Sequence, residues 1–279
     1  MKNVPSRSGE WSVLRRMKEI RGKVVRLFYF LLPLLFIAIL WELIVYFRIV
    51  SPSRTPSPLQ ICLKLYQLTT PKPILLNNLF ESLLRLVLGY MLGALLGILV
   101  GILTGISKPF YRAFSPILSL LISVPTLAWV PLLLVTLGTG DETIVFTIFL
   151  GGFFPVVYNT MNGIRGIEKQ LVWASRIMGA DKTTVFFDVF LPGALVSIIT
   201  GLRLAIGYSW RALVGAEMLA AGISWGVGHM IYAARAFSDV EAMFAGLVII
   251  AVGGILMDRL IMDPIERRTV EKWGMVKER

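Results

Sequence analysis

The strongest constraint on this chain comes from its long apolar runs, which have the length that crosses a lipid bilayer. A bilayer core of about 30 Å requires roughly 20 helical residues. Hydrophobic residues make up 56% of the chain and its mean hydropathy is +0.75, values too high for a soluble fold of this size. The sequence therefore predicts an all-α, polytopic membrane protein with about six transmembrane helices. The expected spans cover residues 27–47, 78–106, 113–137, 143–163, 193–220 and 241–262.

Basic residues are distributed unevenly between the two sides of these spans. Eight Lys or Arg precede residue 27, four lie within 164–190 and five follow residue 262, whereas the opposite side holds five in total. Because Lys and Arg accumulate in cytoplasmic loops, this count predicts cytoplasmic N- and C-termini and a cytoplasmic 164–190 loop. The first apolar run is too long for a signal-peptide core and lacks a small-residue cleavage site, so it is predicted to stay in the membrane.

Composition also excludes several kinds of chemistry. Cys62 is the only cysteine and His229 the only histidine, which excludes an intrachain disulfide and a thiolate cluster and disfavours a multi-histidine metal site or a hydrolytic triad. A Gly-x4-Gly-Lys-Ser/Thr loop is absent, so ATP-driven work would require a partner. The Lys and Arg residues behind the net charge of +11 are neither concentrated on one face nor interleaved with stacking aromatic residues, as a nucleic-acid-binding groove requires. We expect no catalytic residue, no metal, no cofactor and no nucleic acid.

A spaced motif lies in the polar stretch between the fourth and fifth spans. Trp173-Ala-Ser175 is followed by Gly179 and, after nine more residues, by Val189-Phe-Leu-Pro192. This pattern resembles the EAA loop of ABC importer permeases, Glu-Ala-Ala-x3-Gly-x9-Ile-x-Leu-Pro, with Trp173 in place of the glutamate. The resemblance implies a loop that docks a cytoplasmic ATPase. The residues assigned to this contact are Trp173, Ala174, Ser175, Gly179, Ala180, Val189, Leu191 and Pro192.

Each part of this loop has a physical reason. Small side chains let a partner approach, and Gly179 can end a helix in the left-handed conformation. A second short helix can begin at Lys182, and Pro192 suits the first turn of the fifth span. The result is a helix-turn-helix knob. The alternative is an ordinary amphipathic interfacial segment, which does not predict the Gly-x9-Val-x-Leu-Pro spacing.

The resemblance covers about residues 50–262 and narrows the family to permeases for nitrate, sulfonate and taurine. It implies a type I ABC importer-like fold, located in the cytoplasmic (inner) membrane, and a protein that moves a small anionic solute across that membrane. It also implies a homodimer, two ATPase subunits that bind ATP and Mg, and an external solute-binding protein. The matching segments are Ser57-Pro58, Ser82-Leu-Leu-Arg85, Val124-Pro-Thr-Leu-Ala-Trp129-Val-Pro131, Phe154-Pro-Val-Val-Tyr-Asn159-Thr, Gly201-Leu-Arg203-Leu-Ala and Ala216-Glu217-Met.

Together these features predict four parts of the chain. They are a cytoplasmic basic segment over 1–26, the first transmembrane helix with an external linker over 27–76, a permease core over 77–262 with its coupling loop at 164–192, and a cytoplasmic tail over 263–279.

Glycine recurs at every fourth position of the second span, from Gly89 to Gly105. Such a stripe lets another helix approach closely, because lipid supplies no hydrophobic drive for helix association. It is interpreted either as pure packing or as a surface on which helices slide. In the third span, Pro125 and Pro131 remove backbone hydrogen bonds and predict a broken or kinked helix, which either lines the pathway or serves packing alone.

Charged side chains within the spans need partners or a water-filled path. Glu81 and Arg85 are four residues apart and can pair with each other. Arg203 and Glu217 are interpreted first as structural, with a place in the pathway as the alternative. Arg211 departs from the family pattern, and a guanidinium suits an anionic substrate. Trp129 is either a gate or an interfacial anchor. The candidate pathway residues are Trp129, Asn159, Arg203, Tyr208, Trp210, Arg211 and Glu217.

Two other functions remain open at this stage. An ion-gradient-driven secondary transporter would show inverted repeats and midplane carboxylates, whereas the carboxylates here fall near span ends. A membrane enzyme is disfavoured by the single histidine and the lack of clustered acids. The leading prediction is a non-catalytic permease subunit that works by alternating access.

Overall fold

The computed structural model describes residues 29, 32, 33, 35–51, 54–70, 73–220, 222, 224–266 and 269, and the regular structure within them is entirely helical. The chain divides into two compact units, 1–64 and 65–279, which are described separately. In the first unit an apolar helix covers Leu35–Tyr46. The earlier part of the predicted span 27–47 lies outside the described residues, so that span stays a prediction. Helix α2 (Pro58–Thr69) begins in this unit.

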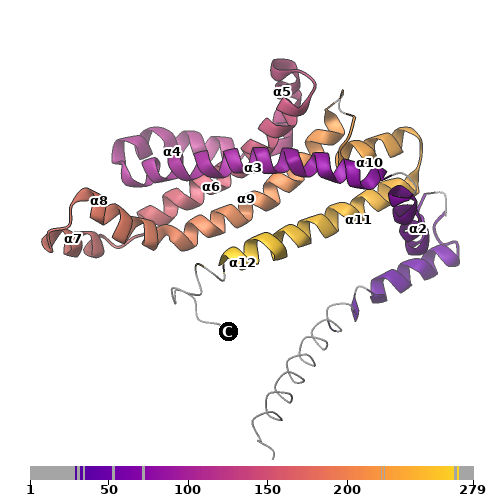
Figure 1. The fold of residues 1–279 in the computed structure, drawn as a ribbon, viewed down its shortest axis with the longest axis horizontal. Helices are drawn as coiled ribbons and strands as arrows, with labels where there is room; N and C mark the ends of the chain where they lie inside the picture. The colour runs from indigo at the N-terminus through magenta and orange to yellow at the C-terminus, as the bar shows by residue number, and fades with distance from the viewer. Residues whose placement is uncertain are drawn as a thin grey trace, which may run out of the picture. The chain divides into compact units, whose positions relative to one another are not determined.

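Within the described residues of the second unit, four helices are long and apolar enough to cross a membrane (Figure 1). Two of them match their predicted spans closely, whereas the fifth predicted span starts eleven residues early, at Lys182, and the sixth extends to Glu266. The four are α3 (Ile74–Ile106), α6 (Asp141–Arg165), the continuous helix Lys182–Leu219 made of α8 (Lys182–Val185), η2 (Phe186–Phe190) and α9 (Leu191–Leu219), and the continuous helix Val240–Glu266 made of α11 (Val240–Met257), η3 (Asp258–Met262) and α12 (Asp263–Glu266).

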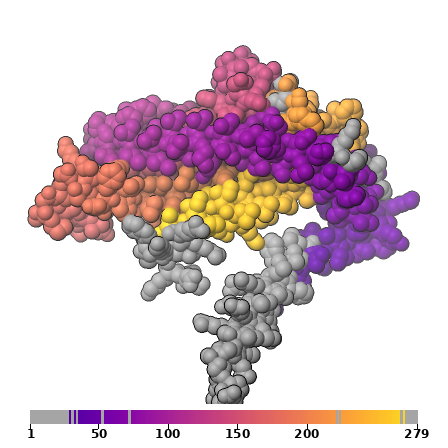
Figure 2. All heavy atoms as spheres, viewed as in Figure 1, coloured from indigo at the N-terminus to yellow at the C-terminus, as the bar shows by residue number. Residues whose placement is uncertain are grey.

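The third predicted span is broken. Helix α4 (Lys108–Ile122) is followed by η1 (Thr126–Trp129) and α5 (Val130–Leu137), and the two halves meet at an angle of 93°. Pro125 has an extended backbone (φ −55°, ψ 130°), so it cannot continue α4. The broken helix predicted from the prolines is therefore confirmed. Figure 2 shows α5 projecting from the body of the second unit.

Helix α6 forms the centre of the second unit, between α3 and α9. The glycine stripe of α3 faces it: a Cβ built at Gly93 would lie 2.9 Å from the Phe149 carbonyl oxygen, and one at Gly101 would lie 2.6 Å from the Thr160 Cβ. On the other side, a Cβ at Gly163 would lie 2.5 Å from the Ser197 Cβ. Absent side chains thus let three helices pack with their backbones close together, as the packing interpretation predicts.

Two π-turns interrupt the long helices, and each is followed by a proline. Segment η2 precedes Pro192, and η3 precedes Pro264. In each turn the N–H donors reach back five residues instead of four, as in the bond from Leu191 to the Phe186 carbonyl. A proline cannot donate to the carbonyl four residues before it, so the wider turn accommodates the proline without ending the helix.

Candidate functional site

The hairpin between α6 and α9 begins with α7 (Lys169–Ile177), which ends in a turn built on Gly179. Gly179 has φ +90°, and its N–H donates to the Arg176 carbonyl at 3.0 Å. The Ala180 N–H donates to the Ser175 carbonyl, also at 3.0 Å. This pair of bonds is the Schellman motif, which strongly favours glycine at the left-handed position. The expected left-handed helix end at Gly179 is confirmed.

The second arm of the hairpin starts at Asp181, whose carboxylate accepts a hydrogen bond from the Thr184 N–H at 2.8 Å. Hydrogen bonds from the Thr184 side chain and backbone hold the pKa of Asp181 below its usual value. From Lys182 the chain continues without a break into α9. Pro192 lies in the first turn of α9, as expected, but the short helix from Lys182 and α9 form one continuous helix rather than two separate ones. The π-turn at η2 is the reason.

The hairpin of α7 and α8 lies at one end of the second unit (Figure 1), and its tip presents large apolar side chains. Trp173 is 62% exposed, and Ile177 and Met178 are more than three-quarters exposed. Ala174 is also exposed, and Ser175 is half-buried. On the other arm Val189, Leu191 and Pro192 are half-buried. The surface available to a partner is therefore formed mainly by α7 and the Gly179 turn.

A buried ionic network lies at the far end of α9. Arg85 of α3 donates to Glu217 of α9 at 2.9 Å, to the Trp225 carbonyl at 2.7 Å and to Asp141 at 2.7 Å. Ser82 also donates to Glu217, at 2.8 Å. The expected pairing of Arg85 with Glu81 is wrong, because Arg85 faces inward toward Glu217. The basic partner of Glu217 is therefore Arg85.

The same network caps α10 (Val227–Ala236) from other helices. The N–H groups of Gly226, Val227 and Gly228 donate to Asn78, Ser82 and Glu217 respectively, at 2.7–2.9 Å. All three acceptor residues are buried. The first N–H groups of a helix have no partners within it, so side chains of α3 and α9 supply what α10 lacks. The sequence identifies Ser82-Leu-Leu-Arg85 as a family motif, but it does not predict the roles of Asn78, Ser82 and Asp141 in this network.

Arg203 is surrounded by three carboxylates from the last helix. Its guanidinium bonds both carboxylate oxygens of Asp258, at 2.8 and 3.1 Å, and also bonds Asp263 and Glu266. The π-turn η3 and the helical turn after it bring these acids together. This arrangement joins α9 to the end of the sixth predicted span, a link in keeping with the structural interpretation of Arg203. Asp263 and Glu266 were expected to lie beyond the helix end, in the tail.

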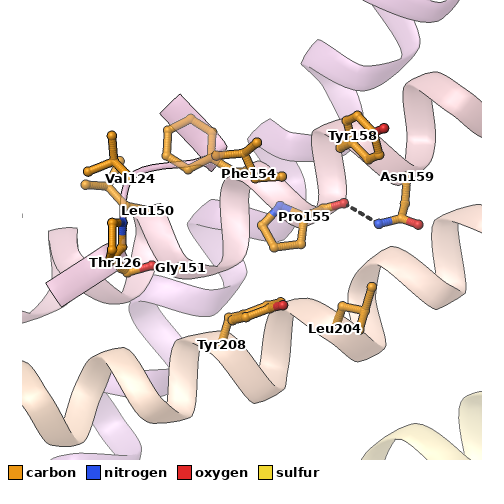
Figure 3. A pocket seen from close by; sticks show the side chains of 12 residues that line it. Val124, Thr126, Leu150, Gly151, Phe154, Pro155, Tyr158, Asn159, Leu204 and Tyr208 are labelled. Carbon is orange, nitrogen blue, oxygen red and sulfur yellow. Dashed lines mark hydrogen bonds between the residues drawn. The ribbon is translucent and has the colours of Figure 1, made fainter. Parts of the chain in front are cut away.

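A cavity of about 420 Å³ opens beside the broken helix (Figure 3). It brings together two of the candidate pathway residues, Asn159 of α6 and Tyr208 of α9. The Asn159 amide donates to the Pro155 carbonyl at 2.8 Å. Most of the lining is apolar and comes from the end of α4, the turn into η1, α6 and α9. The lining residues are Ile122, Val124, Pro125, Thr126, Leu150, Gly151, Phe154, Pro155, Tyr158, Asn159, Leu204 and Tyr208.

A second cavity of about 250 Å³ lies between α9 and the last helix, and its lining includes Arg203, Trp210 and Arg211. The Trp210 indole N–H donates to the Ile250 carbonyl at 3.0 Å. Among the described residues no carboxylate pairs with Arg211, whose guanidinium carbon lies 5.7 Å from the Tyr208 ring centroid. Trp129 is half-buried in η1 and lines neither of these cavities. The candidate pathway residues thus fall into separate groups.

Comparison with known proteins identifies the family. Residues 89–270, which include the hairpin and both cavities, match the family described as "Binding-protein-dependent transport system inner membrane component". The chain belongs to this family. It is therefore a membrane-integral permease of the ABC importer class, related to the permeases for nitrate, sulfonate and taurine.

Three relatives align with most of this permease. A putative aliphatic sulfonates transport permease, SsuC of Bacillus subtilis, is 40% identical over 87% of this chain and 86% of its own length. The nitrate import permease NrtB of Synechocystis is 34% identical, over 75% of this chain and 78% of its own length. The taurine transport permease TauC of Escherichia coli is 32% identical, over 85% and 86% respectively.

Solved structures show the same fold. A chain of the MetNI methionine ABC transporter, in an inward-facing conformation, superposes with a TM-score of 0.60. The match covers 70% of this permease and 96% of that chain, at 23% sequence identity. The predicted all-helical, polytopic type I importer-like fold is confirmed by this likeness. The count of six spans is not fixed by it, since the described residues contain four spanning helices and one bent pair.

Proposed function

We propose that this permease is the transmembrane subunit of an ATP-driven importer for a small anionic solute of the sulfonate, taurine or nitrate type. The observation that carries the proposal is the 40% identity to an aliphatic sulfonate permease across nearly the whole of both chains. The permease itself performs no covalent chemistry. Substrate passes because two arrangements of the transporter open to opposite sides, and ATP binding shifts the balance between them.

The partners follow from the same proposal. A second copy of the permease, two cytoplasmic ATPases that bind ATP and Mg, and an external solute-binding protein complete the transporter. The hairpin from Lys169 to Phe190 is the docking site of the ATPase. Its exposed Trp173, Ile177 and Met178 provide an apolar contact surface in place of the acidic residue of the EAA pattern. The two termini and this hairpin face the cytoplasm, as the distribution of basic residues supports.

Reconstitution tests the proposal. The permease, its ATPase and its solute-binding protein are placed in liposomes with ATP at the ATPase side, and uptake of labelled taurine, an alkanesulfonate and nitrate is measured. We expect uptake of at least one anion that requires both ATP and the binding protein. An ATPase variant unable to hydrolyse ATP serves as the control. Uptake driven by an ion gradient, with no ATP and no ATPase, would instead establish a secondary transporter.

A further inference from the structure

Helix α9 keeps one stripe uncovered although its other faces are packed. Helices α3, α6, α10 and α11 all contact α9. The exposed positions Thr200, Leu204, Tyr208 and Arg211 are spaced four, four and three residues apart, so they lie along one side of the helix. A stripe that faced lipid would be apolar, because charged side chains in a bilayer are costly. The arginine and the hydroxyl groups therefore indicate contact with water or with a polar solute.

Arg211 lines the second cavity and supplies positive charge to this stripe; its guanidinium carbon lies 5.7 Å from the ring centroid of Tyr208, which lines the first cavity. The guanidinium of the neighbouring Arg203 bonds three carboxylates, and both oxygens of Asp258 are used in that contact. Arg211 has no carboxylate partner among the described residues. Between them, a Cβ built at Gly207 would meet nothing within 4 Å, so the helix surface beside Arg211 has open space. Within the described part of the chain, Arg211 is thus a cation in a spanning helix without a carboxylate partner.

The cavity next to the stripe combines hydrogen-bond donors with an apolar wall (Figure 3). Leu204 and Tyr208 form the α9 side, and Asn159 and Tyr158 lie on α6. Within the described residues the Asn159 amide makes one hydrogen bond, to Pro155, which leaves its second N–H available. The Tyr208 hydroxyl has no hydrogen-bond partner in the same part of the chain. Apart from Thr126 the rest of the wall is apolar, and it includes Phe154.

We propose that the uncovered stripe of α9 and the adjoining cavity form a binding subsite for a short-chain organic sulfonate. The sulfonate oxygens bind the Arg211 guanidinium and the Tyr208 hydroxyl, since a planar guanidinium matches an oxyanion with two parallel hydrogen bonds. The alkyl part lies against Leu204 and Phe154. Nitrate has no apolar part and gains nothing from this wall. The inference rests on the proposed function and adds a substrate class that the permease itself recognises.

Two charged thiol reagents of similar size test the subsite directly. Leu204→Cys is made in a Cys62→Ser background and reconstituted with the ATPase. It is treated with 2-sulfonatoethyl methanethiosulfonate and, separately, with the 2-(trimethylammonium)ethyl analogue. We expect the sulfonate reagent to react about tenfold faster relative to the cationic reagent than it does with a free thiol, because one unpaired charge acts within several ångströms. Leu247→Cys, on an exposed position of α11, serves as the matched control and shows no such preference.

Variants and ligands then identify the cause. Adding Arg211→Gln removes the preference, and Arg211→Lys retains it. Butanesulfonate slows labelling of Leu204→Cys, whereas nitrate at the same concentration does not. An unlabelled Leu204→Cys thiol, an unchanged preference after Arg211→Gln, or equal protection by nitrate would each overturn the subsite.

The proposed function is measured separately, as ATP-dependent uptake by the parent. If the parent shows no ATP-dependent uptake but the labelling pattern of Leu204→Cys is as expected, the ATP-driven function is rejected and the subsite is not.

Discussion

Arg85 gives the sharpest test of how the end of α9 opposite the hairpin is held in place. Arg85→Leu leaves Glu217 fully buried without a counter-ion and the Trp225 carbonyl without its donor. Removing one partner of a buried ion pair costs about 3–5 kcal/mol. The contact of Arg85 with Asp141 adds less, about 0–1 kcal/mol, because Asp141 is 59% exposed. The buried half of the network therefore determines the size of the effect.

Thermal unfolding of the detergent-solubilised permease, followed by tryptophan fluorescence, measures this loss. A change of 3–5 kcal/mol corresponds to a fall in midpoint temperature of roughly 6–20 °C for a protein of this size class. Arg211→Leu is the matched control, since it removes the same side chain from a spanning helix without breaking an ion pair. Its effect is expected to stay within about 0.5 kcal/mol, as for an exposed substitution.

A second substitution in the same network tests the cause. Glu217→Gln, added to Arg85→Leu, removes the uncompensated charge while nearly keeping the side-chain shape. We expect it to restore part of the lost stability, with a coupling free energy of about 0.5–3 kcal/mol. If Arg85→Leu were no more harmful than Arg211→Leu, or if the two network substitutions simply added, the ion-pair account would be refuted.

The remaining predictions concern the glycine stripe and the hairpin. Gly93→Val should lower the midpoint temperature sharply, because its Cβ would meet the α6 backbone at 2.9 Å, whereas Gly207→Ala should be neutral or stabilising; equal effects would contradict the packing role of the stripe. Gly179→Arg should uncouple ATP hydrolysis from uptake, whereas Gly179→Asn should retain more coupling because asparagine tolerates the left-handed conformation. Trp173→Glu should be tolerated, and full coupling in Gly179→Arg would count against hairpin docking. Because the pKa of Asp181 is lowered in the folded state, its cap is complete above the ordinary aspartate pKa of about 3.9 and is lost only as pH falls through the lower folded pKa. Coupling measured between pH 6 and 8 should therefore show no titration from this residue. Asp181→Asn should match the parent, whereas Asp181→Ala, which removes the cap, should not.

The elements with strong local signals could be predicted from the sequence. Long apolar runs predicted the spanning helices, Pro125 predicted the break in the third span, and Gly179 predicted the left-handed turn. In each case the decisive physical property belongs to one residue or to its immediate neighbours. The resemblance to the EAA loop, which depends on a fixed spacing, placed the hairpin correctly in the chain.

The ionic partners could not be predicted in the same way. Arg85 meets Glu217 across 132 positions of sequence and meets Asp141 across 56. Local spacing suggested Glu81 because it lies one helical turn away, but helix packing turns Arg85 toward the core. The partners of Arg203 were missed because the π-turn at η3 carries the helix beyond its expected end. A π-turn depends on tertiary packing as well as on the proline that follows it.

The continuous helix from Lys182 to Leu219 has a mechanical consequence. Its 38 residues correspond to about 57 Å at a rise of 1.5 Å per residue, so one continuous helix joins the hairpin to the buried Glu217 network. No loop separates the end that an ATPase would grip from the stretch that carries Tyr208 and Arg211. A tilt of the hairpin would therefore also displace those side chains. The π-turn before Pro192 interrupts the regular hydrogen bonds of this helix and is the point at which we expect it to bend.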